Sequence, residues 1–460
     1  MEKLKQPNVV FIISDQWSTK IADGLSNNKN NIETPYLDKL AKEGIAFTNS
    51  YSSYPLCCPA RASMFTGCMP HDNGVSHNQE IWQHVFGKLP KKDEIKTLGG
   101  TLEKAGYETA YFGKEHASEY GYDGIQNKGS MLYSAGGFIS EGSVFDSIFT
   151  KDAINYLRKE HNKPFYMTLS LINPHDICKA LLCEGGLSNK SIMDTIIFCD
   201  QEDKPYLRNS ERGKLPDNFN SPPIEGMAEY RDSIYSANDA FDENLWRRFI
   251  STYSILIEKT DWYIGLVLEE LERQGLTEDT LVIFTSDHGD MLGAHKLVAK
   301  TYMYEESVKT HAILRYPNLI KEGQINSHSF INTIDLMPTI LDICNVKIPD
   351  TVKGKSFKPE CLGEKTSNFK ETFSENMFCK MLRFDNFKYV ESVVYGTRYK
   401  ILFDLEKDAD ETENVFNKKG YEEISKYAED RMKRYLEEEN LEDVYFDYNK
   451  IFKGKVKIGS

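Results

Sequence analysis

Strand-like runs rich in apolar residues constrain this chain more than any other feature. Residues 8–14 hold a continuous apolar run from Val9 to Ile13, and two further predicted strands lie at 164–171 and 280–285. Such runs are typical of strands buried on both faces, as in a parallel sheet that helices cover from both sides. Helix-like stretches separate them, at 34–41, 98–105 and 249–274. We therefore predict an α/β fold in which helices sandwich a large, mixed, mostly parallel sheet.

The composition changes to Pro, Gly and Lys near residues 347–362, as is typical of a domain boundary. We predict a large α/β domain over 1–362 and a small C-terminal α+β domain over 363–460, with an antiparallel sheet and a helix. The elements expected in the small domain are two strands and a charged helix, at 388–394, 397–403 and 421–438. The irregular segment 176–244 predicts a surface insertion that shapes the mouth of a site.

The charge and the cysteines limit the possible partners and the compartment. The formal net charge is −14, which argues against nucleic acid and anionic membranes as partners. No apolar run could span a bilayer and none has signal-peptide length, so we expect a cytoplasmic protein. The nine cysteines include no CxxC pair, which argues against a zinc ribbon and predicts free thiols. An anionic substrate would need a local cluster of basic groups.

Two acidic clusters follow predicted strands. Asp15-Gln16 comes directly after the first strand, and Asp287-His288-Gly289-Asp290 follows the strand at 281–285. Ligands of such sheets bind beyond the carboxyl ends of the strands, so these groups could form a site for a hard cation. An Asp after a strand is about equally often only a helix cap.

A short cysteine motif lies between the two clusters. In Cys57-Cys58-Pro59-Ala60-Arg61, Pro59 favours the first turn of a helix. Cys57 would then lie at the positive end of that helix, where an anion is favoured, with Arg61 one turn further on. On these residues alone, buried apolar packing is the commoner role of such cysteines.

The motif is part of an ordered series. It continues into Ala62-Ser63 and Thr66-Gly67, and further segments are Phe112-Gly113-Lys114-Glu115-His116, Asn173-Pro174-His175, Ser286-Asp287-His288-Gly289, Lys300, and Tyr399-Lys400 with Phe403-Asp404-Leu405. Together with Asp15, the series resembles the type I sulfatases of the alkaline phosphatase-like superfamily across nearly the whole chain. In that family the signature cysteine is oxidised to formylglycine, and the register selects Cys57 over Cys58.

The resemblance implies a site for calcium, with magnesium possible. The implied metal ligands are Asp15, Gln16, Cys57 (as formylglycine), Asp287 and His288. The metal and Arg61 would hold the formylglycine as a hydrated gem-diol. Many sulfatases have a second aspartate in place of Gln16 and an asparagine in place of His288. Both replacements occur in branches that act on choline sulfate, phosphonate monoesters and some glycans.

The resemblance also implies the catalytic roles. Asp287 would accept a proton as one gem-diol hydroxyl attacks sulfur. Lys114 and Lys300, with Arg61, would stabilise the sulfuryl oxygens. His175, assisted by Lys300, would protonate the leaving alcohol. His116 would deprotonate the second hydroxyl and so expel sulfate.

The predicted function is therefore hydrolysis of a sulfate monoester, on a small imported saccharide, after modification by a formylglycine-generating maturation enzyme. A phosphonate or phosphodiester hydrolase of the same superfamily is an alternative, although that branch typically lacks the pair Lys114 and His116. A second alternative is an inactive glycan-binding homologue in which Cys57 stays unmodified. His295 could face substrate, and His71 is assigned no catalytic role.

Overall fold

The computed structural model describes residues 6–78, 95–116, 141–178, 212–227, 243–364, 366, 368–394 and 396–441. A seven-stranded sheet forms its centre. In sheet order the strands are β4 (Glu108–Gly113), β5 (Phe165–Pro174), β1 (Asn8–Asp15), β6 (Thr280–Ser286), β8 (Ile313–Arg315), β2 (Ile45–Phe47) and β9 (Gln324–Asn326). The first four are parallel to one another, and β8 runs antiparallel to both its neighbours. The predicted mixed, mostly parallel sheet is confirmed.

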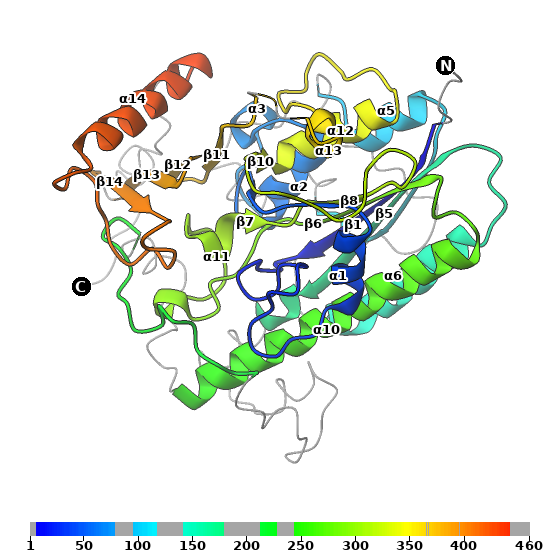
Figure 1. Ribbon diagram of the computed structural model, residues 1–460, viewed down its shortest axis with the longest axis horizontal. Helices are drawn as coiled ribbons and strands as arrows, with labels where there is room; N and C mark the ends of the chain where they lie inside the picture. Colours follow the sequence, from blue (N-terminus) through cyan, green and yellow to red (C-terminus); the bar gives the residue numbers. More distant parts are fainter. Residues whose placement is uncertain are drawn as a thin grey trace, which may run out of the picture.

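Strand β1 shows why its apolar run is unbroken. Val10 and Ile12 lie in one core, whereas Val9, Phe11 and Ile13 lie in another on the opposite face. The first core is closed by α1 (Pro35–Lys42), α6 (Glu141–Leu157) and α10 (Glu243–Arg273). The second is closed by α2 (Cys57–Thr66), α5 (Leu98–Lys104), α12 (Leu336–Ile343) and α13 (Lys358–Cys361). Figure 1 shows these two helical layers on either side of the sheet.

The start of α1 differs in detail from the sequence prediction. Thr34 is the residue before the helix, as expected, but its side chain makes no capping hydrogen bond. Asp261 of α10 instead accepts hydrogen bonds from the backbone N–H groups of Tyr36 (3.2 Å) and Leu37 (2.8 Å). A carboxylate from a distant helix therefore caps α1 and fastens it to α10.

A four-stranded antiparallel sheet follows the large sheet in sequence, with β11 (Glu371–Glu375), β12 (Cys379–Phe384), β13 (Phe387–Val394) and β14 (Thr397–Asp404) in order. One of its faces packs on α14 (Glu422–Glu438), through Leu382, Tyr389 and Leu402. The other packs on residues of the α/β part such as Tyr304 and Met291. Figure 1 shows α14 on the outer side of this sheet. The expected antiparallel sheet and helix are confirmed.

Two organisational predictions remain predictions. The boundary at residue 362 is one of them. The insertion 176–244 is the other, because of its residues only 176–178, 212–227 and 243–244 are described. Within the described part of the chain, no helix is both long and apolar enough to cross a membrane.

Candidate active site

The four parallel strands end at the same edge of the sheet and bring predicted site residues together. Asp15 is the last residue of β1, and Asp287 follows β6 directly. Lys114 follows β4, and His175 follows β5. Because β4, β5, β1 and β6 are neighbours in register, their carboxyl ends converge on one site.

The end of β5 is held in place by helix α6. Asp146 accepts hydrogen bonds from the backbone N–H groups of Ile172 (2.7 Å) and Asn173 (3.0 Å). Asp176 in turn accepts from two backbone N–H groups in the first turn of α6, at 3.1 and 2.7 Å. These contacts extend β5 past the predicted residue 171 and fix the backbone on both sides of His175.

The two adjacent cysteines have different surroundings. Cys57 begins α2, and its Sγ lies 3.3 Å from His288 Nε2 and 3.7 Å from Asp15 Oδ1. His116 and His175 also lie close enough to Cys57 to interact with its side chain. Cys58 instead belongs to a small apolar cluster with Ala62, Cys68, Val75 and Ile95. Only Cys57 therefore faces the groups at the strand ends.

Arg61 joins the two acidic clusters. Its Nε donates to Asp287 Oδ2 at 2.9 Å and its Nη2 to Asp15 Oδ2 at 3.1 Å. Nη1 donates to Ser170 Oγ (2.7 Å) and to the carbonyl of Lys114 (2.9 Å). The side chain is fully buried, and these bonds occupy four of its five N–H groups. Arg61 is therefore positioned to orient both carboxylates.

Lys114 lies where the backbone leaves β4. The preceding Gly113 has φ +113°, and a Cβ on it would lie 1.9 Å from the Ser170 carbonyl oxygen, so only glycine fits. The turn directs Lys114 Nζ to Asp15 Oδ2, at 2.8 Å. Steric crowding against Ser170 therefore explains why a glycine precedes Lys114.

Gln16 links the site to residues further along the chain. Its side-chain oxygen accepts a hydrogen bond from Lys300 Nζ, and its Nε2 donates to Asp290 Oδ2. Cys178 Sγ lies 3.3 Å from the same amide. All ten predicted site residues are thereby gathered in one place: Asp15, Gln16, Cys57, Arg61, Lys114, His116, His175, Asp287, His288 and Lys300.

The balance of charge in the site favours an anion at residue 57. Burial opposes ionisation of Cys57, yet Lys114 and Lys300 hold the pKa of its thiol well below the usual value. Burial and the same two lysines lower the pKa of His175 to about 4. Burial, followed by the charge of Asp15, raises the pKa of Asp287. An anionic group at this position therefore meets several fixed cations.

The residues around Cys57 also fit a divalent cation. One ligand atom from each of Asp15, Cys57, Asp287 and His288 lies within 4.8 Å of all the others, and all four residues are buried. The two buried carboxylates supply the oxygen ligands that such cations prefer. Gln16 Oε1 accepts a hydrogen bond from Lys300, so it is not directed at the space between these four ligand atoms.

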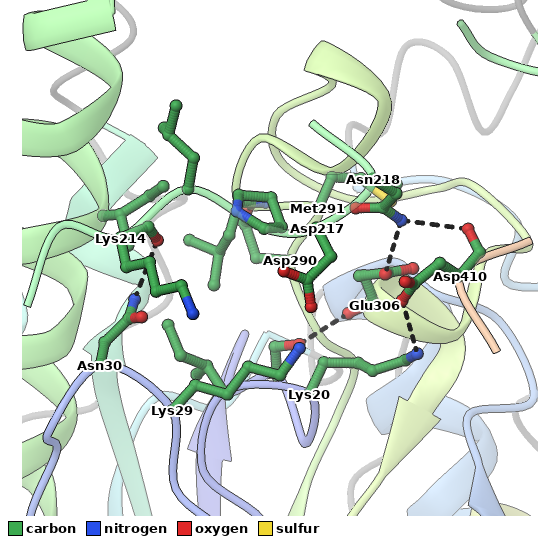
Figure 2. Close-up of a pocket in the computed structure, with 16 residues that line it drawn as sticks. Lys20, Lys29, Asn30, Lys214, Asp217, Asn218, Asp290, Met291, Glu306 and Asp410 are labelled. Atoms are coloured by element: carbon green, nitrogen blue, oxygen red, sulfur yellow. Dashed lines mark hydrogen bonds and ion pairs between the residues drawn. The ribbon is translucent and has the colours of Figure 1, made fainter. Parts of the chain in front are cut away.

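Asp290 is a site residue to which the sequence prediction gave no role, although it was part of the second acidic cluster. It is fully buried, and burial raises its pKa to about 6. It also lines a neighbouring cavity of about 190 Å³, which Figure 2 shows with Lys20, Lys29 and Lys214 opposite acidic groups. None of the ten predicted site residues lines that cavity.

His295 contacts Tyr304 and Asn218. Its side chain is buried and stacks on Tyr304, with ring centroids 4.3 Å apart. Its Nε2 lies 3.3 Å from the side-chain amide of Asn218. That His295 could face substrate stays a prediction.

Comparison with known proteins agrees with this geometry. The family model described as Sulfatase matches residues 7–346, and the one described as N-sulphoglucosamine sulphohydrolase, C-terminal, matches residues 293–438. The N-acetylglucosamine-6-O-sulfatase of Bacteroides thetaiotaomicron is 28% identical, over 94% of this chain and 88% of the relative.

Solved structures share the fold over almost the whole chain. A 2-O GAG sulfatase has a TM-score of 0.79 at 24% identity, covering 95% of this chain and 93% of that one. The phosphonate monoester hydrolase of Agrobacterium radiobacter has a TM-score of 0.71 at 19% identity, covering 94% and 96%. Since the Sulfatase model spans most of the chain and the strand ends hold the expected groups, the chain belongs to the sulfatase family and is a sulfuric ester hydrolase.

Proposed function

We propose that residue 57 of the active enzyme is formylglycine and that the substrate is a sulfate monoester of a small saccharide. The observation that carries the proposal is the position of Cys57 Sγ, 3.3 Å from His288 Nε2 and 3.7 Å from Asp15 Oδ1. This sulfur marks the place that the oxygens of the modified side chain would take. The modification requires a separate formylglycine-generating enzyme, which we include among the partners.

We further propose that the cation is Ca²⁺, with Mg²⁺ as the alternative. Asp15, Asp287, His288 and the modified residue 57 would hold it, since their ligand atoms already lie within 4.8 Å of one another. Gln16 would join them if its amide oxygen turned away from Lys300. Bound there, the cation would supply positive charge next to the sulfuryl oxygens and the attacking hydroxyl.

The side chains of the site then have distinct tasks. Asp287, whose pKa is raised by burial, is suited to accept the proton of the hydroxyl that attacks sulfur. Lys114 and Lys300 stabilise the negative charge on the sulfuryl oxygens. His175 gives a proton to the alcohol oxygen as its bond to sulfur breaks. The negative charge of the bound sulfate ester, held between Lys114 and Lys300, would raise the lowered pKa of His175 and so keep it protonated for this step. His116, which lies beside residue 57, accepts the proton whose removal releases sulfate and restores the aldehyde.

The saccharide is supported by the relative that is named for a sugar sulfate. The phosphonate monoester hydrolase shares the fold, so an aryl phosphonate is the alternative substrate. Lys114 and His116 beside Cys57 favour sulfate. The second alternative is an inactive homologue: if Cys57 stayed unmodified, the protein would bind glycans without hydrolysing an ester.

The test is a parallel assay of defined sulfated mono- and disaccharides, an aryl sulfate and the matched aryl phosphonate ester. We expect at least one saccharide sulfate to be hydrolysed, with kcat/KM for the aryl sulfate above that for the phosphonate. A preference for the phosphonate with no saccharide sulfate hydrolysed would overturn the proposal. Binding of saccharides without turnover of any ester would indicate the inactive homologue.

A further inference from the structure

A second group of metal-ligand side chains lies where α3 (Pro70–Asn73) meets the end of α14 and β11. His71 and Asp72 belong to α3, and Glu439 is the residue directly after α14. One ligand atom from each of these three lies within 4.8 Å of the other two. The sulfatase reaction uses none of them.

The distances suit coordination better than hydrogen bonding. His71 Nε2 lies 3.7 Å from Asp72 Oδ2 and 3.7 Å from Glu439 Oε2. Both distances exceed the usual limit of about 3.2 Å for an N–H···O hydrogen bond. Two ligand atoms that are each about 2.1 Å from a Zn²⁺ ion are about 3.4 Å apart at the tetrahedral angle of about 109°. The two separations of 3.7 Å are slightly wider than this, so small movements of the side chains would bring the atoms onto one ion.

Two of the three ligand atoms are buried without a hydrogen-bond partner, namely His71 Nε2 and Asp72 Oδ2. The His71 side chain is only 10% exposed. When Nδ1–H donates to Glu375, the neutral His71 ring presents a lone pair at Nε2, so two unpaired acceptors face each other. Buried polar atoms normally have a partner, so this arrangement needs an explanation. A cation that both atoms ligate would satisfy them together.

The other ring nitrogen of His71 is fixed as in many metal sites. His71 Nδ1 lies 3.0 Å from Glu375 Oε2 and 3.1 Å from Glu375 Oε1, and the backbone N–H of His71 donates to the same carboxylate at 2.9 Å. A carboxylate on the second nitrogen commonly orients a metal-ligating histidine. Lys380 forms an ion pair with Glu375, and Asp72 and Glu439 are the carboxylates that lie nearest to His71 Nε2.

We propose that His71 Nε2, Asp72 and Glu439 bind one divalent transition-metal cation of the zinc class. Imidazole with carboxylates suits such ions. Asp72 and Glu439 also line a cavity of about 230 Å³, so these two ligands are reached from an open space, whose charged lining further includes Lys353, Lys355, Glu371, Arg431 and Glu438. The ion would join α3 to the end of α14 and so stabilise the packing of the C-terminal helix on the rest of the protein.

The experiment uses the full chain, saturated with Ca²⁺ and freed of other metals, and titrates it with Zn²⁺ alone. Bound zinc is counted by elemental analysis, and the melting temperature is measured with and without zinc. Asp72→Asn and Glu439→Gln each remove one ligand charge at a partly exposed position. Glu437→Gln, on the exposed face of α14, is the matched control. Because every protein keeps Cys57, zinc bound at residue 57 cancels in the comparison.

Wild type and Glu437→Gln should bind one zinc more than the two ligand variants, and zinc should raise their melting temperature. The ligand variants should bind this zinc at least tenfold more weakly and lose the shift. Co²⁺ in place of zinc should add no thiolate charge-transfer band at this site, because the ligands are nitrogen and oxygen. Equal zinc content and equal melting shifts in all four proteins would overturn the proposal and leave His71 as a protonated ion-pair partner.

Discussion

Replacing Arg61 with lysine tests whether one buried guanidinium holds the two acidic clusters together. An ammonium keeps the charge but lacks the rigid fork, so it cannot reach both Asp15 and Asp287 while it also serves Ser170. We expect the loss of one bond to a carboxylate, about 1.5–3 kcal/mol, and of one neutral bond, about 1 kcal/mol. Arg61→Lys should therefore lower the free energy of unfolding by roughly 3 kcal/mol, within the range for breaking a buried ion pair.

The assay is urea denaturation with a chelator present, so that no cation compensates for the lost guanidinium. Arg158→Lys is the matched control, because Arg158 makes a similar two-pronged contact with Glu270, at 2.9 and 3.0 Å, with a side chain that is 51% exposed. Solvent weakens such a pair, so the control should lose far less stability than Arg61→Lys. Equal losses in the two variants would refute the idea that the buried fork organises the site.

Exhaustive chelation should abolish turnover. Asp287→Asn should lower both the bound Ca²⁺ and the turnover, measured in the same samples. Full activity without detectable metal would contradict the cation site. His175→Ala should lower kcat/KM for a sugar sulfate by about 100- to 10,000-fold and for an activated aryl sulfate much less. The measurement is kcat/KM for a series of sulfate esters whose leaving groups have graded pKa values. An equal loss for every leaving group would exclude His175 as the general acid. Burial lowers the pKa of His311 from 6.5 to about 4, so the unfolded chain takes up the proton first, and this histidine's contribution to stability is complete above pH 6.5 and is lost towards pH 4. Urea denaturation between these pH values should show the decline, and His311→Gln should flatten it.

The parts of the fold that follow from local sequence could be predicted. The apolar run of β1 identified a strand buried on both faces, and its end placed Asp15 at the sheet edge. Pro59 and the small residues after it identified α2, and the motif's register selected Cys57, which alone of the cysteine pair faces the site. These features depend on neighbouring residues, which the sequence shows directly.

Contacts between distant residues could not be predicted from local patterns. Asp261 caps α1 from 224 residues away in the chain, in place of the expected Thr34. Asp290 reaches Gln16 across 274 residues. Nothing in the sequence around His71 distinguishes it from a surface histidine, because its partner Glu375 is 304 residues away. Lys114 and Lys300 were identified only through the family resemblance, since isolated lysines are mostly exposed.

The most direct test of the central claim is peptide mass spectrometry of residue 57 in active enzyme, combined with turnover by Cys57→Ala and Cys58→Ala. We predict an aldehyde in place of the thiol at residue 57, an intact thiol at Cys58, no turnover by Cys57→Ala and most of the activity in Cys58→Ala. Cys58 packs in an apolar cluster, so its loss should leave the site geometry unchanged. A fully active enzyme with an unmodified thiol at residue 57, or with the aldehyde at residue 58, would contradict the account.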